Sequence, residues 1–177
     1  MTFDLQQSYF KLFNLPQRFQ LDQSALETAY HELHAQVHPD RHAHLTEAER
    51  RRSMQWATRV NEGFQVLKKP LARAQYLLEL AGIDTGLETN TAMSPEFLME
   101  QMEWREAIEE ARHAGDGGAL EQLHARLRQQ ARAMIEQVEE LLDIQQNLSA
   151  AAEMVRRLMF IERLQLDIDN ALEALES

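Results

Sequence analysis

Apolar side chains recur three and four residues apart along most of this chain, and that spacing restricts the fold more than any other feature. Leu26, Tyr30 and Leu33 give a clear example within residues 23–37, where one face of a helix is apolar and the other polar. Only six Gly and four Pro interrupt the 177 residues, so helix is favoured nearly everywhere. We find no strand pattern and expect an all-α fold.

Residues that start and stop helices divide the chain further. Asp22, Thr46 with Glu49, and Ser94 before Pro95 are start signals. Together with the apolar spacing they predict helices at about 8–13, 23–37, 46–68, 71–80, 95–113, 119–146 and from Asn147–Ser149 to near the C-terminus. Six residues of the helix after Thr46 are expected to lie along one side of it: Met54, Ala57, Val60, Asn61, Phe64 and Leu67.

The segment 82–94 is rich in helix breakers and is interpreted as a linker. We therefore expect a small helical N-terminal domain over residues 1–76. A connecting helix end and linker follow over 77–94. Residues 95–177 are expected to form an antiparallel three-helix bundle with short loops.

Charge is distributed unevenly between the two parts. The formal net charge is −11, yet residues 1–76 hold 10 Lys+Arg and 8 Asp+Glu, whereas residues 77–177 hold 8 and 21. The acidic second part argues against nucleic acid, whose phosphates need a basic surface. The mildly basic first part suits an acidic partner protein.

The chain contains no cysteine, which excludes disulfides, thiolate catalysis and thiolate metal sites and agrees with a reducing compartment. Residues 1–5 do not combine a basic region with an apolar run, so no signal peptide is expected. No run approaches the ~18 apolar residues of a transmembrane helix. We expect a cytoplasmic protein that does not bind a membrane.

A polar loop containing His38, Pro39 and Asp40 separates two of the predicted helices. Pro39 fixes the local backbone and removes a donor. Asp40 offers a charge that can pair with an arginine of a partner, and His38 offers a donor and an acceptor. A His-Pro-Asp tripeptide alone is weak evidence, since an ordinary helix–loop–helix can contain one.

The surroundings of this loop make it more specific, because a short apolar helix and a helix of about four turns precede it and a capped long helix follows. The sequence here resembles the J-domain family. The resemblance implies that His38, Pro39, Asp40 and Arg41 dock on a DnaK-type chaperone and stimulate its ATP hydrolysis. One departure is that residues 23–37 contain no Lys or Arg; nearby positive charge comes from Arg18, Arg41, Arg50, Arg51 and Arg52.

Five histidines lie close together in the sequence: His31, His34, His38, His42 and His44. His31 and His34 share a helical face, so a metal could bridge them. Exposed polar surface on a docking face is the simpler interpretation, because the spacing fits no zinc signature. We expect neither a metal site nor a cofactor.

The helix that begins at Pro95 has more apolar residues than one buried stripe needs. Phe97, Gln101, Trp104, Ile108 and Ala111 share one arc, which is a natural core face. Leu98, Met99 and Met102 fall elsewhere, bordered by Glu103 and Glu106. An apolar patch with methionines and a charged rim suggests a partner site; the alternative is that the N-terminal domain covers it.

Four segments resemble the HscB family, the J-domain co-chaperones of iron–sulfur cluster assembly: residues 5–21, 61–78, 97–106 and 156–161. The resemblance implies a two-domain adaptor that stimulates a dedicated chaperone of the HscA type and delivers the scaffold protein IscU to it. It also implies the scaffold contacts, which are Leu98, Met99, Met102, Glu103, Glu106 and Phe160. Because the N-terminal cysteine zinc site of some eukaryotic relatives is missing, the sequence is similar to the bacterial type.

Three other functions are weighed against this one. A general J-domain co-chaperone for unfolded clients is the first, although no Gly/Phe-rich linker or zinc-binding client domain is present. An enzyme is the second, but no nucleophile with its base, phosphate loop or metal site is recognisable, and we expect no enzymatic activity. The third is a histidine-rich metal-binding protein.

Overall fold

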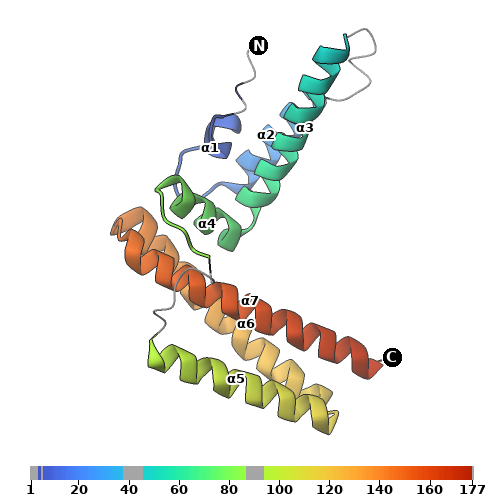
Figure 1. Cartoon of the computed structure of the whole chain (residues 1–177), viewed down its shortest axis with the longest axis vertical. Coiled ribbons are helices and arrows are strands. Elements are labelled where there is room, and N and C mark those ends of the chain that lie inside the picture. Colours follow the sequence, from blue (N-terminus) through green and yellow to red (C-terminus); the bar gives the residue numbers. More distant parts are fainter. Residues whose placement is uncertain (1–3, 5, 38–45, 87–93, 177) are drawn as a thin grey trace. The chain divides into compact units, whose positions relative to one another are not determined.

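The computed structural model describes residue 4 and residues 6–37, 46–86 and 94–176. Every regular element in these ranges is helical, which confirms the predicted all-α class. Figure 1 shows the elements, which in chain order are α1 (Tyr9–Leu12), α2 (Gln23–Val37), α3 (Glu47–Lys68), α4 (Pro70–Leu80), α5 (Pro95–Ala114), α6 (Gly117–Glu139), the π-helical turn η2 (Glu140–Ile144) and α7 (Leu148–Glu176).

The chain divides into two compact units, Met1–Leu80 and Ala81–Ser177, and each is considered by itself. The domain boundaries expected at residues 76 and 94 stay a prediction.

In the first unit, α2 and α3 pack side by side in opposite directions (Figure 1). The Gln23 side chain at the start of α2 donates to the Lys68 carbonyl at the end of α3, over 3.4 Å. Further along, the Tyr30 hydroxyl donates to the Asn61 side chain over 3.0 Å. The largest fully buried side chains of the hairpin include Leu26 and Leu67, and their removal from water is the main stabilising contribution.

The short helix α1 packs against this hairpin and α4 through contacts of aromatic side chains. The Tyr9 backbone amide donates to the Tyr76 hydroxyl over 3.0 Å, and the Arg59 guanidinium lies 4.8 Å from the centre of the Tyr9 ring. A Cβ atom at Gly63 would lie 2.7 Å from Tyr9 Cδ1. Glycine at this position of α3 therefore permits the close approach of α1.

The pattern along α3 did not show which residues of the predicted side are buried. Met54 was placed on the same side as Val60 and Phe64, but its side chain is 71% exposed, while Trp56 is buried. At about 100° per residue, Met54 lies at one edge of the predicted side, roughly 120° from Val60, and spacing alone does not show that this edge is exposed. Trp56, one turn before Val60, occupies the buried face instead.

The second unit is a bundle in which α6 and α7 make the longest contact and α5 packs on both. Its fully buried side chains include Leu120, Leu127, Val138 and Ile168. The turn between α5 and α6 is very short. Gly115 ends α5 in the left-handed region at φ 65°, and the Asp116 side chain accepts the Ala119 amide at 2.9 Å. The predicted three-helix bundle is thus confirmed, and a tight turn joins α5 to α6 at one end of it.

The connection from α6 to α7 differs from the prediction, which was one long helix to about residue 146. The α-helix ends at Glu139, and η2 follows, with the Gln145 amide donating to the Glu140 carbonyl at 2.9 Å. Gln146 then has φ 52°. The Asn147 side chain caps α7 by accepting the Ala150 amide at 3.2 Å. The π turn widens the end of α6 by one extra residue.

Candidate partner-binding surfaces

The predicted chaperone-binding residues His38, Pro39, Asp40 and Arg41 lie outside the residues that the structure describes. Their role therefore stays a prediction. The helices on either side are described: α2 ends at Val37, and Thr46 caps α3. The loop thus connects the two helices of an antiparallel hairpin, as the sequence suggested.

Helix α5 has two apolar faces. Phe97, Ile108 and Ala111 are buried against the bundle, at 6%, 5% and 6% exposure. On the other side, Leu98 is 47% exposed and Met99 and Met102 are each 62% exposed. The predicted core arc of α5 is therefore buried at Phe97, Ile108 and Ala111 and partly buried at Trp104, and the surplus apolar residues are on the surface.

Strong local signals hold α5 in this orientation. The Ser94 hydroxyl accepts the Phe97 amide at 3.3 Å, and Pro95 occupies the first helical position. On the bundle side, Gln130 of α6 donates to the Glu100 carboxylate at 2.7 Å. The Arg126 guanidinium lies 5.0 Å from the centre of the Trp104 ring. These contacts fix which side of α5 faces α6.

We define the α5 surface as five exposed residues of this helix: Leu98, Met99, Met102, Glu103 and Glu106. Their spacings of three and four residues place them together on one side of the helix. Three apolar side chains beside two carboxylates suit an apolar partner surface that carries basic groups at its edge. Methionine adapts its shape readily to such a partner.

Phe160, the sixth predicted scaffold contact, is not part of this surface. It is 5% exposed on α7. Its ring meets Phe97 edge-on, with centroids 5.8 Å apart, and the Arg105 guanidinium lies 5.6 Å from its centre. In this conformation Phe160 is a packing residue between α5 and α7. The helical spacing of α7 could not reveal this, because the contact comes from another helix.

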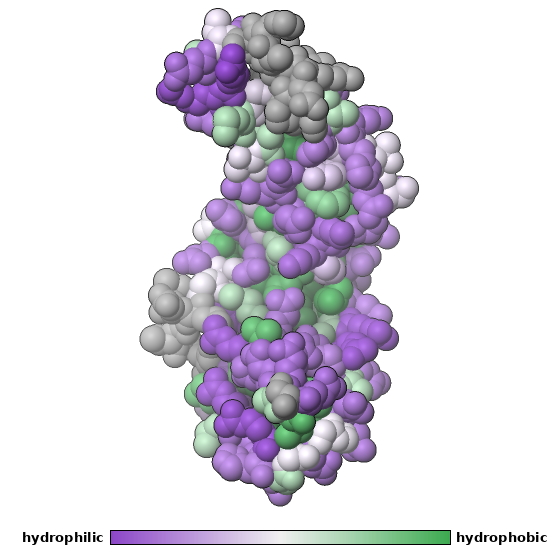
Figure 2. All heavy atoms as spheres, turned by 90° about the vertical axis from the view of Figure 1, so that its right-hand side faces the viewer, coloured by the Kyte–Doolittle hydropathy of each residue, from purple (hydrophilic) through white to green (hydrophobic). Residues whose placement is uncertain are grey.

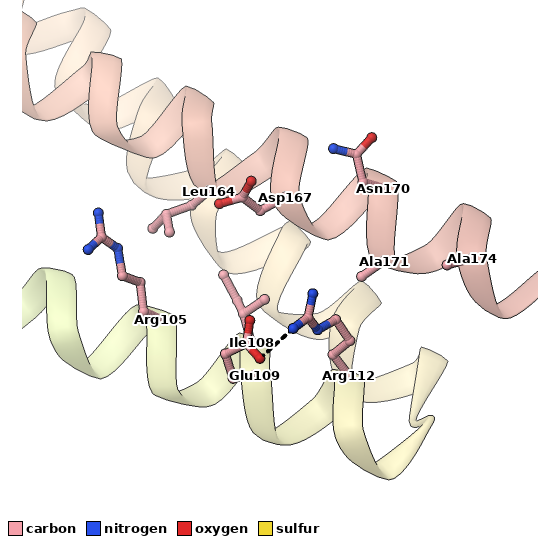
Figure 3. A pocket seen from close by; sticks show the side chains of 9 residues that line it. All are labelled: Arg105, Ile108, Glu109, Arg112, Leu164, Asp167, Asn170, Ala171 and Ala174. Atoms are coloured by element: carbon pink, nitrogen blue, oxygen red, sulfur yellow. Dashed lines mark hydrogen bonds and ion pairs between the residues drawn. The ribbon is translucent and has the colours of Figure 1, made fainter.

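Beside Arg105, α5 and α7 enclose a groove of about 430 Å³ (Figure 3). Ile108, Leu164 and Ala171 form its apolar base. Arg112 and Glu109 at its edge are held together by an ion pair of 2.7 Å. Sequence reasoning did not find this groove, because its two walls are distant in the chain.

Polar side chains cover most of the face drawn in Figure 2, and apolar atoms are exposed in smaller areas among them. Within the described residues, no group of three or more His, Cys, Asp or Glu side chains is placed to hold a metal ion. His31 and His34 are both exposed on α2. No helix in the described part of the chain has the length and apolar character needed to cross a bilayer.

Comparison with known proteins places this geometry in context. Residues 93–169 match the family model described as the HSCB C-terminal oligomerisation domain. A co-chaperone protein HscB homolog from Azoarcus sp. (strain BH72) is 67% identical over the full length of both chains. A homolog of the same name from Burkholderia multivorans is 51% identical over 98% of each chain.

Two solved structures are also similar. Chaperone HscB from Vibrio cholerae has a TM-score of 0.83 and 36% identity, covering 96% of this chain and 99% of its own. Human co-chaperone protein HscB has a TM-score of 0.87 and 26% identity, covering 94% of this chain and 83% of its own. These proteins are named as chaperones or co-chaperones, and their names indicate no enzymatic activity.

Proposed function

The chain belongs to the HscB family of co-chaperones, and from this premise we propose that it links a DnaK-type chaperone to an iron–sulfur scaffold protein. In this proposal His38, Pro39, Asp40 and Arg41 dock on a chaperone of the HscA type and stimulate its ATPase. The α5 surface binds the scaffold IscU. The protein is thus an adaptor that aids the maturation of iron–sulfur proteins.

The observation that carries the proposal is the pair of opposite apolar faces on α5. One face closes the bundle core, and Leu98, Met99 and Met102 remain exposed on the other. Exposed apolar side chains grouped on one helix are typical of a binding site. They lie within the 93–169 segment that matches the family model.

The test is a steady-state ATPase assay of the cognate HscA-type chaperone. We expect this protein and IscU together to raise the rate by more than the product of their separate effects, because an adaptor brings the two partners together. Stimulation that is the same with IscU and with an unfolded client would instead indicate a general J-domain co-chaperone.

The loop is tested with His38→Gln. We expect this variant to lose stimulation of the chaperone ATPase while binding IscU as tightly as the wild type, because the loop and the α5 surface belong to different units. Isothermal titration measures the second quantity. Full stimulation by the variant would contradict the role of the loop.

A further inference from the structure

Methionine carries all the sulfur of this chain. The sequence has eight methionines and no cysteine, so thioethers are the only sulfur groups that an oxidant can meet. A peroxide converts a thioether to a sulfoxide, which replaces an apolar group by a polar one. The methionines that react first are those whose sulfur atom the oxidant can reach.

Burial divides the methionines of the described residues. Met54, Met99 and Met102 are 71%, 62% and 62% exposed. Met134 is only 9% exposed in the bundle, and the two methionines of α7 are half-buried. Met99 and Met102 are three residues apart and therefore lie together on the α5 surface. A peroxide can reach both of them without any opening of the fold.

The charge around Met99 and Met102 favours a neutral oxidant. Glu103 and Glu106 border them on α5, and residues 77–177 carry 8 Lys+Arg against 21 Asp+Glu. An acidic surface of this kind repels anions. Hydrogen peroxide is uncharged near neutral pH, so it is not repelled. The class of oxidant that fits this surface is therefore a hydroperoxide.

The hydroperoxide itself balances the reaction. A lone pair of the methionine sulfur attacks one peroxide oxygen, so that the S–O bond forms and the O–O bond breaks. The sulfur is oxidised and the peroxide is reduced. With hydrogen peroxide, the second oxygen leaves as water after it takes up the proton of the transferred oxygen.

We propose that Met99 and Met102 are an oxidation site for hydroperoxides, and that their sulfoxides release the iron–sulfur scaffold from the α5 surface. This inference rests on the proposed function. A sulfoxide oxygen is an acceptor, and Glu103 and Glu106 beside it offer no proton when ionised. A buried acceptor without a donor weakens an interface. Methionine sulfoxide can be reduced enzymatically, so the release is reversible.

The test uses full-length wild type that hydrogen peroxide has oxidised in part. The protein is passed over immobilised IscU, and mass spectrometry of proteolytic fragments gives the sulfoxide fraction at each methionine in the retained and unretained protein. We expect sulfoxide at Met99 and Met102 to be at least about tenfold rarer in the retained protein, the order expected for one unsatisfied buried acceptor. Met54 is the internal control, because it is exposed but belongs to the other unit. Its sulfoxide fraction should be equal in both.

Two matched variants provide a second measurement. Met99→Leu combined with Met102→Leu leaves no sulfur on the α5 surface, whereas Met54→Leu keeps both thioethers there. The affinity of each full-length variant for IscU is compared with its own value after oxidation. Oxidation should weaken binding by Met54→Leu as much as by the wild type, and should leave the affinity of the double variant unchanged. Methionine sulfoxide reductases should restore binding by the oxidised wild type.

The outcomes separate this inference from the function on which it rests. If IscU does not retain the unoxidised wild type, the proposed function fails. If IscU retains it but sulfoxide at Met99 and Met102 is equally common in both fractions, the inference alone is wrong. It is also wrong if oxidation weakens the double variant as much as the wild type. A loss of helix in the oxidised wild type, measured by circular dichroism, would contradict it as well, because unfolding would then cause the release.

Discussion

Met99 and Phe160, which the sequence assigned to one binding site, differ in how far they are buried. Met99 is 62% exposed on α5, whereas Phe160 is 5% exposed between α5 and α7. Phe160 also contacts Phe97 and Arg105. A substitution at Phe160 therefore changes the bundle, and its effect on binding cannot be separated from stability by a binding assay alone.

Substituting each residue by Ala should give opposite results. Phe160→Ala should lower the free energy of unfolding by about 3–5 kcal/mol, because it leaves a cavity in the bundle. Met99→Ala should change it by no more than about 0.5 kcal/mol and weaken IscU binding at least about tenfold, as expected of a residue central to an interface. Urea denaturation and isothermal titration measure the two quantities. Equal stability of both variants would contradict the packing role of Phe160.

At the scale of elements, helix ends are set by local hydrogen bonds. The Thr46 hydroxyl accepts the Glu49 amide at 3.4 Å, and the Glu49 carboxylate accepts from the Thr46 amide at 2.9 Å. The hydrogen bonds from the Thr46 side chain and backbone lower the pKa of Glu49 below its ordinary 4.5. The charged form of Glu49 therefore stabilises the start of α3.

Thr46→Ala should cost about 1 kcal/mol near neutral pH, the usual contribution of an N-cap. Because the pKa of Glu49 is lower in the folded chain, its contribution is present above pH 4.5 and is lost as pH falls through the folded value. The difference between wild type and variant should therefore shrink in acid. Thermal unfolding between pH 7 and pH 3 measures it.

Ser94→Ala provides the comparison for that experiment. Ser94 also caps a helix through its hydroxyl, but the residue three positions later is Phe97, which has no carboxylate. Its effect on stability should vary less with pH. A Thr46→Ala effect that is equally large at pH 3 would contradict the contribution of Glu49.

Features that depend only on residues close together in the sequence could be predicted from it. Asp22, Thr46 with Glu49, and Ser94 with Pro95 act within four residues, and the structure confirms each cap. The π turn at Glu140–Ile144 has no comparable signal, because it inserts one residue without a special residue type.

The candidate binding residues divide in the same way. The exposure of Leu98, Met99 and Met102 follows from helical spacing along α5 alone. The burial of Phe160 and the exposure of Met54 do not, because they depend on which neighbouring helix covers each position. The loop at His38–Asp40 is known from sequence only.

At the scale of the whole molecule, the chain joins two compact units of unlike charge. The proposed chaperone-binding loop belongs to the first unit and the α5 surface to the second. A single chain that carries both sites raises the effective concentration of one bound partner near the other. Neither unit by itself provides this effect.

Mixing two defective full-length proteins tests this consequence. One is His38→Gln, and the other carries Ala at Leu98, Met99 and Met102. We expect the mixture to show no more than about a tenth of the wild-type synergy between IscU and the chaperone ATPase, because no molecule in it carries both sites. The measurement is the ATPase rate at saturating IscU. Full synergy in the mixture would show that the two sites need not be linked.

The two faces of α5 also have a consequence for how such a protein diversifies. Residues 97, 108 and 111 hold the bundle together, whereas residues 98, 99 and 102 face outward and contribute little to stability. Mutations can therefore accumulate on the outward face without loss of the fold. A library randomised at those three positions offers a direct route to bundles that recognise new clients.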